Sequence, residues 1–289
     1  MPEPARTIRH HFTVDVEEYF QVAALTSAVT RASWDDRPSR LAVGMRVLLD
    51  TLAEHETRGT FFVLGWIAER HRRLMTELVA AGHEIASHGW GHERVTILTP
   101  EAFRASVRDS RRKLEDLSGT GVYGYRAPSF SIVRGGEWAL EILAEEGYRY
   151  DSSLYPVRRP GYGFAGGRRD PHQIQTPRGP LDELPPATVR FASAVLPAGG
   201  GAYLRLFPYR LVRSAFAEAE ERGVPATFYI HPWELDPEQP RLDVSMLTRI
   251  RHYGGLRRTE PRIRQLLADF AFQPIAETLG LTRALAARS

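Results

Sequence analysis

Cysteine is absent from this chain of 289 residues, which excludes disulfide bonds and thiolate chemistry. A zinc site in such a chain must therefore use histidine and carboxylate ligands. Lysine is nearly absent as well, since Lys113 is the only one, and the numerous arginines are spread along the sequence. Because no basic stripe alternates with aromatic residues, we do not expect nucleic acid as a partner, despite the net charge of +3.

Long apolar runs are also missing from the sequence. No window approaches the roughly 18 apolar residues of a membrane-spanning helix, so we expect no stable insertion into a membrane. Residues 1–6 contain no apolar core of a signal peptide, and on that basis we expect a cytoplasmic protein. The hydrophobic fraction of 43% and the charged fraction of 25% are typical of a globular protein, and no linker or internal repeat divides the chain.

Segments with the pattern of strands alternate with segments that have the pattern of helices. The predicted strands are residues 8–16, 59–64, 83–88, 121–126, 148–151 and 226–231. The predicted helices are residues 39–56, 66–81, 99–118, 136–146, 208–222 and 259–270. This alternation predicts a parallel α/β barrel or open sheet. Residues 154–205 interrupt it, and we interpret them as an insertion of loops and short strands, one near residues 181–191, that lines one face.

Charged or imidazole residues stand at the carboxyl ends of five predicted strands. They are Asp15, His88, Arg126, Asp151 and His231. Because the active sites of parallel α/β folds are built at this end of the strands, we expect the five side chains on one rim.

Two histidines and two acids in this group have the spacing of a metal site. His88 and His92 are four residues apart in a glycine-containing turn, so both rings can reach one cation, although a chance surface turn has the same pattern. Asp15 and Glu17 share one side of a strand end. One carboxylate can then bind the metal while the other stays free as a base, which is a catalytic arrangement.

The remaining rim residues can assist proton transfer. Arg126 can pair with the free carboxylate and keep it ionised and oriented. His231 can protonate a leaving amine. Together with a bound cation, these residues predict a metal-assisted hydrolase of an amide or an ester.

Five motifs occur in the order and spacing of a known family. They are residues 13–17 (TVDVE), 87–92 (SHGWGH), 126–128 (RAP), 150–153 (YDSS) and 228–234 (FYIHPWE). Over nearly its whole length the chain resembles the NodB-homology polysaccharide deacetylases, carbohydrate esterase family four. More narrowly, it resembles the PEP-CTERM-associated deacetylases found with bacterial exopolysaccharide loci. The resemblance implies an α/β fold in a single domain, residues 1–289, with a distorted (β/α) barrel of about residues 8–153 and 206–276 and an insertion of about residues 154–205.

The same resemblance implies a role for each site residue. Asp15 matches the general base, Arg126 the arginine that holds it, His231 the general acid, Asp151 the acid that supports His231, and the backbone N–H of Ser129 the oxyanion-hole donor. His88 and His92 match metal ligands, and the implied metal is Zn²⁺, with Co²⁺, Ni²⁺ or Mn²⁺ as alternatives. The family usually has two adjacent aspartates in its first motif. Val16 follows Asp15 here, so we expect Glu17 to be the replacement ligand.

Aromatic side chains are candidates for contact with a sugar, and core packing is the alternative for each tryptophan. The candidates are Trp90, Phe130, Tyr203, Trp233 and Tyr253. The implied activity removes N-acetyl groups from N-acetylhexosamine units of an exopolysaccharide or its precursor, a hydrolysis of non-peptide carbon–nitrogen bonds. The exopolysaccharide biosynthesis machinery is then a candidate partner. Two alternatives stay open: a metal-free amidohydrolase of the same fold that acts on a small amide, and a non-catalytic glycan-binding relative.

Overall fold

The computed structural model describes residues 8–159, 162–192 and 194–281. Residues 1–6, on which the signal-peptide expectation rests, lie outside the described residues. None of the described helices combines the length and the apolar content that crossing a bilayer requires.

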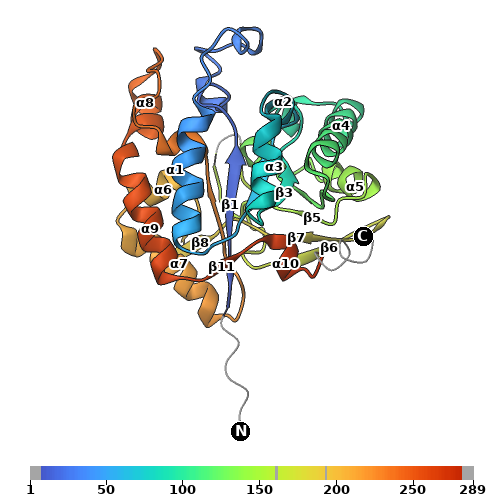
Figure 1. Cartoon of the computed structure of the whole chain (residues 1–289). Coiled ribbons are helices and arrows are strands. Elements are labelled where there is room, and N and C mark those ends of the chain that lie inside the picture. Colours follow the sequence, from blue (N-terminus) through green and yellow to red (C-terminus); the bar gives the residue numbers. More distant parts are fainter. Residues whose placement is uncertain (1–7, 160–161, 193, 282–289) are drawn as a thin grey trace.

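One curled sheet forms the centre of the molecule (Figure 1). Its strands are β1 (His10–Val16), β2 (Thr60–Val63), β3 (Glu84–Ser87), β4 (Gly124–Tyr125), β5 (Tyr150–Asp151), β6 (His172–Thr176), β7 (Gly179–Glu183), β10 (Thr227–Ile230) and β11 (Phe272–Gln273). Their order is β10-β1-β2-β3-β4-β5-β7-β6, and β11 also pairs with β1. Pairing is parallel except between β6 and β7. The mixed α/β fold with a barrel-like sheet confirms the predicted fold class.

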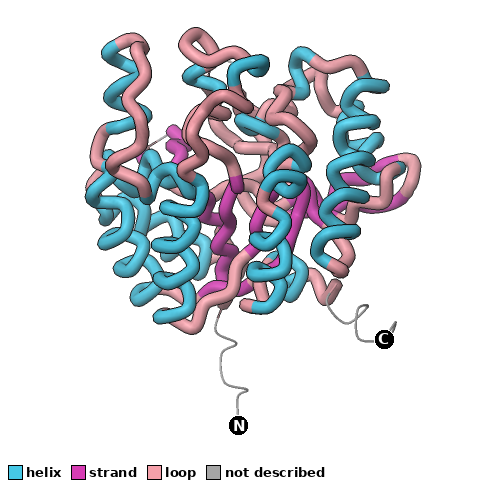
Figure 2. The backbone as a smooth tube through the Cα atoms, turned by 45° about the horizontal axis from the view of Figure 1, so that its top comes forward, coloured by secondary structure: helices cyan, strands magenta, loops and turns pink. Residues whose placement is uncertain are grey.

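Helices surround this sheet, with the strands in the middle of the molecule (Figure 2). They are α1 (Leu41–Glu54), α2 (Gly65–Arg70), α3 (Arg72–Ala80), α4 (Pro100–Ser118), α5 (Trp138–Glu145), α6 (Gly201–Leu206), α7 (Tyr209–Glu221), α8 (Met246–Tyr253), α9 (Thr259–Asp269) and α10 (Ile275–Thr278). Helix α4 begins and ends as its sequence predicts. The Thr99 side chain accepts from the backbone N–H of Ala102, and Gly119 ends the helix with φ +68°.

The prediction of one helix over residues 66–81 is wrong. The structure divides this segment into α2 and α3 at His71, whose backbone leaves the helical region at φ −117° and ψ 52°. No proline or glycine marks the break in the sequence. The first turn of α2 is fixed from outside, because the N–H groups of Gly65 and Trp66 donate to the carbonyls of Gly89 and Trp90. Tertiary hydrogen bonds of this kind leave no local signal.

The sequence predicts residues 154–205 as an insertion that lines one face of the molecule, but part of this segment joins the main sheet. The predicted strand near residues 181–191 is divided into β7, which joins the main sheet beside β5, and β8 (Thr188–Phe191), which pairs with β9 (Ala194–Pro197). Pro185 and Pro186 lie between the two strands, where proline removes backbone donors. Pro186 and Gly200 also form isolated bridges to β10, so this segment flanks the strand that precedes His231.

All seven residues of β1 are buried, because the strand is paired with three others. It lies between β2 and β10, and Asp15 stands near its carboxyl end. His88 follows β3, Arg126 follows β4 and His231 follows β10. Since these strands are parallel, their carboxyl ends meet at the same edge of the sheet, where the site described below is found.

Candidate active site

A cavity of about 370 Å³ opens at the carboxyl edge of the sheet. Nine of the predicted site residues line it, and five of these carry a carboxylate or an imidazole: Asp15, Glu17, His88, His92 and His231. These five come from β1 and the residue after it, from the loop after β3 and from the residue after β10. The structure therefore brings together side chains that are more than 200 positions apart in the sequence.

Glu17, His88 and His92 form what we call the ligand cluster. One ligand atom of each lies within 4.8 Å of the others, and all three residues are buried. With Nδ1 protonated, His88 donates to the backbone carbonyl of Arg126 at 2.8 Å, which turns its Nε2 toward the cluster. Burial lowers the pKa of His88 to about 4, so its ring is neutral at pH 7, as a metal ligand must be.

Glu17 is the acidic member of the ligand cluster. Its Oε1 accepts a hydrogen bond from the indole N–H of Trp233 at 3.1 Å. Its Oε2 lies 2.6 Å from Nε2 of His92, yet the geometry makes no hydrogen bond, and Oε2 has no hydrogen-bond donor among the described residues. Burial by itself raises the pKa of Glu17, but the interaction of its carboxylate with the neighbouring imidazoles of His92 and His231 outweighs burial and brings the pKa well below its ordinary value.

The donor set of the ligand cluster fits a divalent cation. It offers two imidazole nitrogens and one carboxylate oxygen, and a buried carboxylate oxygen without a donor is what a cation would satisfy. Three protein ligands leave coordination positions open, as in catalytic rather than structural sites. The backbone of His92 has φ +62°, a strained value for a residue other than glycine, which the sequence pattern does not reveal.

Asp15 is held by a completely buried arginine. Nη1 of Arg126 donates to Oδ1 of Asp15 and to the hydroxyl of Thr13, each at 2.7 Å. The other guanidinium nitrogens donate to the carbonyl and the hydroxyl of Ser152. The guanidinium also lies 4.1 Å from the ring centroid of Phe62. These contacts leave the second oxygen of Asp15 facing the cavity, 3.8 Å from Nε2 of His231.

His231 lies between acids on both sides. Its Nδ1 donates to Glu234 at 2.8 Å, and its Nε2 lies 3.7 Å from Oε1 of Glu17. Glu234 is in turn bound by the buried Arg205 at 2.8 Å. Burial alone lowers the pKa of His231, but the negative charges of Glu17, Glu234 and Asp15 outweigh it and raise the pKa to about 9. His231 is therefore protonated at neutral pH and can act as a proton donor.

The acid that contacts His231 is Glu234, and the assignment of this role to Asp151 is therefore corrected. Asp151 instead accepts from the hydroxyl and the backbone N–H of Ser153, and it pairs in the sheet with Glu183. Burial raises the pKa of both acids, and neither is among the residues that line the cavity. Glu234 stands three residues after His231, a spacing that closes a short turn and that could have indicated the contact.

Ser129 and Phe130 line the cavity from a strained turn after β4. Their φ values are +56° and +51°, so two consecutive residues adopt the left-handed conformation. Such strain is concentrated at functional sites, where the surrounding structure maintains it.

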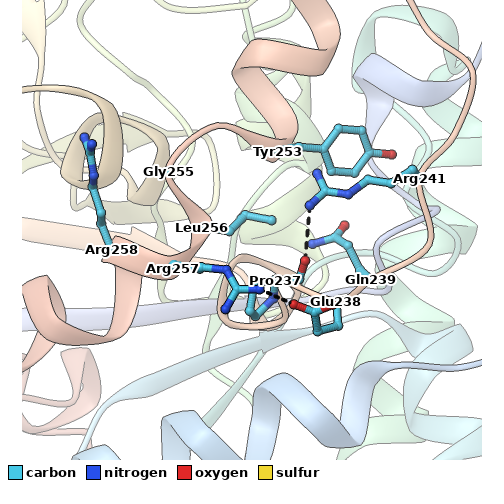
Figure 3. A pocket seen from close by; sticks show the side chains of 9 residues that line it. All are labelled: Pro237, Glu238, Gln239, Arg241, Tyr253, Gly255, Leu256, Arg257 and Arg258. Carbon is cyan, nitrogen blue, oxygen red and sulfur yellow. Dashed lines mark hydrogen bonds and ion pairs between the residues drawn. The ribbon is translucent and has the colours of Figure 1, made fainter.

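Among the aromatic candidates, Phe130, Tyr203 and Trp233 line the cavity, but Trp90 and Tyr253 do not. The Trp90 ring packs so closely on Gly65 that a Cβ there would lie 2.5 Å from it. The hydroxyl of Tyr253 accepts from the N–H of Leu242, and the guanidinium of Arg241 lies 4.4 Å from the centroid of its ring (Figure 3). Trp90 and Tyr253 are thus packing residues in this structure.

The sequence identifies Trp233 as a candidate for sugar contact, but in the structure it also contacts other residues of the site. Its ring is stacked between His231, at a centroid distance of 5.1 Å, and His252, at 4.2 Å. The same ring donates to Glu17. Trp233 therefore contacts both the ligand cluster and the candidate proton donor, a double contact for which the sequence has no signal.

Two family models together match most of the chain. Residues 27–150 match the family described as polysaccharide deacetylase. The chain carries a polysaccharide deacetylase domain. The matched residues contain His88, His92 and Arg126, whereas Asp15 and Glu17 precede them. The second model, described as a domain of unknown function (DUF3473), covers residues 152–280 and completes the sheet of the deacetylase domain with β6, β7, β10 and β11.

Named deacetylases are among the relatives of this deacetylase domain. A peptidoglycan deacetylase of Helicobacter pylori is 32% identical over 114 residues, which are 39% of this chain and 37% of that protein. A chitooligosaccharide deacetylase of Rhizobium leguminosarum bv. trifolii is 33% identical over 125 residues, which are 43% of this chain and 53% of that protein. The chain thus spans about half or less of the length of these curated relatives.

Solved structures share the fold of the deacetylase domain. A Mycobacterium smegmatis protein assigned to the polysaccharide deacetylases has a TM-score of 0.62 and 21% identity, and the match covers 98% of this chain and 94% of that one. The allantoinase Puue has a TM-score of 0.59 and 19% identity, over 96% and 90% of the two chains. At these identities the likeness concerns the fold alone.

Proposed function

We propose that this protein is a metal-dependent polysaccharide deacetylase that hydrolyses N-acetyl groups. The observation that carries the proposal is one cavity lined by the ligand cluster, by a second carboxylate on Asp15 and by the imidazole of His231. A metal site, a base and an acid are the three parts that amide hydrolysis of this kind requires.

Glu17, His88 and His92 would hold the metal, most simply Zn²⁺, since nitrogen and oxygen ligands suit it and no cysteine is available. Co²⁺, Ni²⁺ and Mn²⁺ are alternatives for the same donor set. When bound, such a cation supplies Lewis-acid polarisation of the acyl oxygen and of the attacking water.

The side chains of the protein carry the proton transfers in this proposal. Asp15 accepts a proton from the attacking water, whose oxygen bonds to the acetyl carbon, while Arg126 keeps the carboxylate oriented. His231 then donates its proton to the amide nitrogen, the carbon–nitrogen bond breaks, and acetate and a free amine are formed. The backbone N–H of Ser129 is the candidate donor to the negatively charged acyl oxygen.

For the substrate, we propose N-acetylhexosamine units of an exopolysaccharide or its precursor. The names of the relatives support sugars with N-acetyl groups, since they refer to peptidoglycan and chitooligosaccharides. Phe130 and Tyr203 provide ring surface for a sugar at the cavity wall. We also propose that residues 1–289 act as one domain, because β10 and β11 pair with β1.

Metal analysis of the protein purified without chelators tests this function. We expect about one equivalent of a divalent metal in the wild type and little in His88→Ala, because the cluster loses one of three ligands. His55→Ala, outside the cavity, is the matched histidine control and should keep the metal. A wild type without stoichiometric metal would refute the mechanism, and amide hydrolysis by that metal-free protein would favour a metal-free amidohydrolase.

Acetate release completes the test. Chitooligosaccharides, peptidoglycan fragments and N-acetylated exopolysaccharide preparations are offered to the metal-loaded wild type and to His88→Ala. Release from at least one of them by the wild type alone is expected. Glycan binding without any release, unchanged in Asp15→Asn, would favour the non-catalytic glycan-binding reading.

A further inference from the structure

Helix α8 carries an exposed apolar surface beside the candidate active site. Met246 and Leu247 are each 70% exposed and Ile250 is 53% exposed. Their spacing places them on one side of the helix, whereas the buried His252 lies on the opposite side. Leu206 at the end of α6 extends this surface, since it lies beside Gly254 at the end of α8 and is itself 39% exposed.

This surface, which we call the α8 surface, is continuous with the cavity of the deacetylase domain. Leu247, Thr248 and Arg251 of the same helix line that cavity. In Figure 1, α8 projects at the end of the molecule toward which the arrow of β1 points. A partner on the α8 surface would therefore lie at the entrance to the site.

Positive charge surrounds the α8 surface. Residues 241–258 contain five arginines and one aspartate, a net charge of +4, whereas the whole chain of 289 residues has only +3. Arg249 and Arg251 are exposed on α8 itself. Arg241, Arg257 and Arg258 line the neighbouring hollow, where Arg257 pairs with Glu238 (Figure 3).

We propose that the α8 surface docks on an anionic lipid bilayer and brings membrane-attached glycan to the active site. Flexible apolar side chains within a group of arginines are the pattern of a segment that lies in the membrane interface. Met, Leu and Ile have no rings on which a sugar could stack, so this surface does not suit a glycan. A second copy of the chain would bring together two segments of residues 241–258, each with a net charge of +4, and their repulsion opposes a dimer. The substrate part of this inference rests on the proposed deacetylase function, while the docking does not.

Co-sedimentation with vesicles tests the docking. The full chain is mixed with vesicles of equal parts phosphatidylcholine and phosphatidylglycerol, and with phosphatidylcholine alone. The wild type should bind the anionic vesicles, more weakly at high salt, and Met246→Ser/Ile250→Ser should bind at least about tenfold less, because two inserted side chains are lost. The matched control, Phe191→Ser, removes a side chain of 65% exposure on β8 and should bind as the wild type does.

The possible outcomes separate docking from catalysis. Asp15→Asn should bind vesicles normally, and Met246→Ser/Ile250→Ser should release acetate from a soluble fragment normally, because neither of its two residues lines the cavity. Equal binding of the double variant and the wild type, or no binding to anionic vesicles, would overturn the inference. A concentration-dependent dimer seen by light scattering and lost in the double variant would assign the surface to a second copy instead.

Discussion

The two parts of the chain, residues 8–150 and 152–281, contribute different chemistry to one cavity. The first part provides the ligand cluster and the carboxylate of Asp15. The second part provides His231 together with Glu234 and Trp233, which hold it. The segment whose family has no assigned function therefore supplies the candidate proton donor. A division of the chain into two family matches does not correspond to a division of the site.

The largest effect is expected when the base that residues 8–150 contribute to the cavity is removed. Asp15→Asn keeps the size of the side chain but removes the base, so kcat should fall about 10²–10⁴-fold, with the bound metal retained. Acetate release and metal content are measured on the same preparation. Asp50→Asn, on the exposed side of α1, is the control. Activity of Asp15→Asn within a factor of ten of the wild type would exclude Asp15 as the base.

The next largest effect is expected when residues 152–281 lose the acid that holds the candidate proton donor. Glu234→Gln removes the negative charge that faces Nδ1 of His231 and leaves Arg205 without its ion pair. We expect kcat to fall roughly 10–100-fold with a smaller change in KM, because Glu234 acts through the orientation and charge of His231. Steady-state kinetics checks this, with the exposed Glu238→Gln in the same loop as the control. A change confined to KM would contradict a role in positioning His231.

A smaller effect is expected when the hydrogen bond between the two parts, from Trp233 to Glu17, is removed. Trp233→Phe keeps a ring between His231 and His252 but removes the N–H that Glu17 accepts. Metal affinity should weaken about tenfold, since groups that orient a ligand tune the affinity of the site. Chelator competition measures the dissociation constant, and Trp138→Phe on α5 is the control. An unchanged constant would mean that the indole does not orient Glu17.

The smallest expected effect concerns stability within the first part. Nδ1 of His83 accepts from the N–H of Gly59, and burial lowers the pKa of His83 to about 4. The unfolded chain binds this proton near pH 6.5, so the free energy of unfolding should fall as the pH drops from about 6.5 toward 4. At pH 5.5 the loss from His83 is about 1 kcal/mol. Urea denaturation at pH 7.5 and 5.5 measures it.

His83→Gln provides the comparison for this titration. Glutamine can still accept from Gly59 but does not titrate, so its stability should decrease less between the two pH values than that of the wild type. Equal losses in both proteins would show that His83 does not contribute to the pH dependence.

The sequence predicts the sheet and the rim because both follow from local patterns. The periodicity of apolar residues and the helix-capping residues are sufficient to predict β1 and α4. They also place Asp15 and His231 near the carboxyl ends of their strands. The residues that hold the site side chains in place could not be predicted in this way. Arg205 is separated from Glu234 by 29 positions, and Trp233 from Glu17 by 216. Such contacts are fixed only by packing, so no local pattern contains them.

Asp151 shows how a correct position can receive an incorrect role. It is the last residue of β5, at the predicted edge of the sheet, but β7 pairs with β5 and places Glu183 beside it. The sequence gives no sign that residues 179–183 join the main sheet, because their loop-rich surroundings resemble an insertion. Strand order, which long-range pairing decides, therefore holds Asp151 beside Glu183, while the local turn after His231 brings Glu234 to that ring.

The position of β1 between β2 and β10 also has a consequence for biosynthesis. His11 pairs with Thr227 across 216 positions, so the cavity cannot be complete before the C-terminal part of the chain has been made and has returned to β1. The two histidines of the ligand cluster can meet early, since they are neighbours in sequence. A growing chain would thus be able to capture a cation well before it could turn over any substrate.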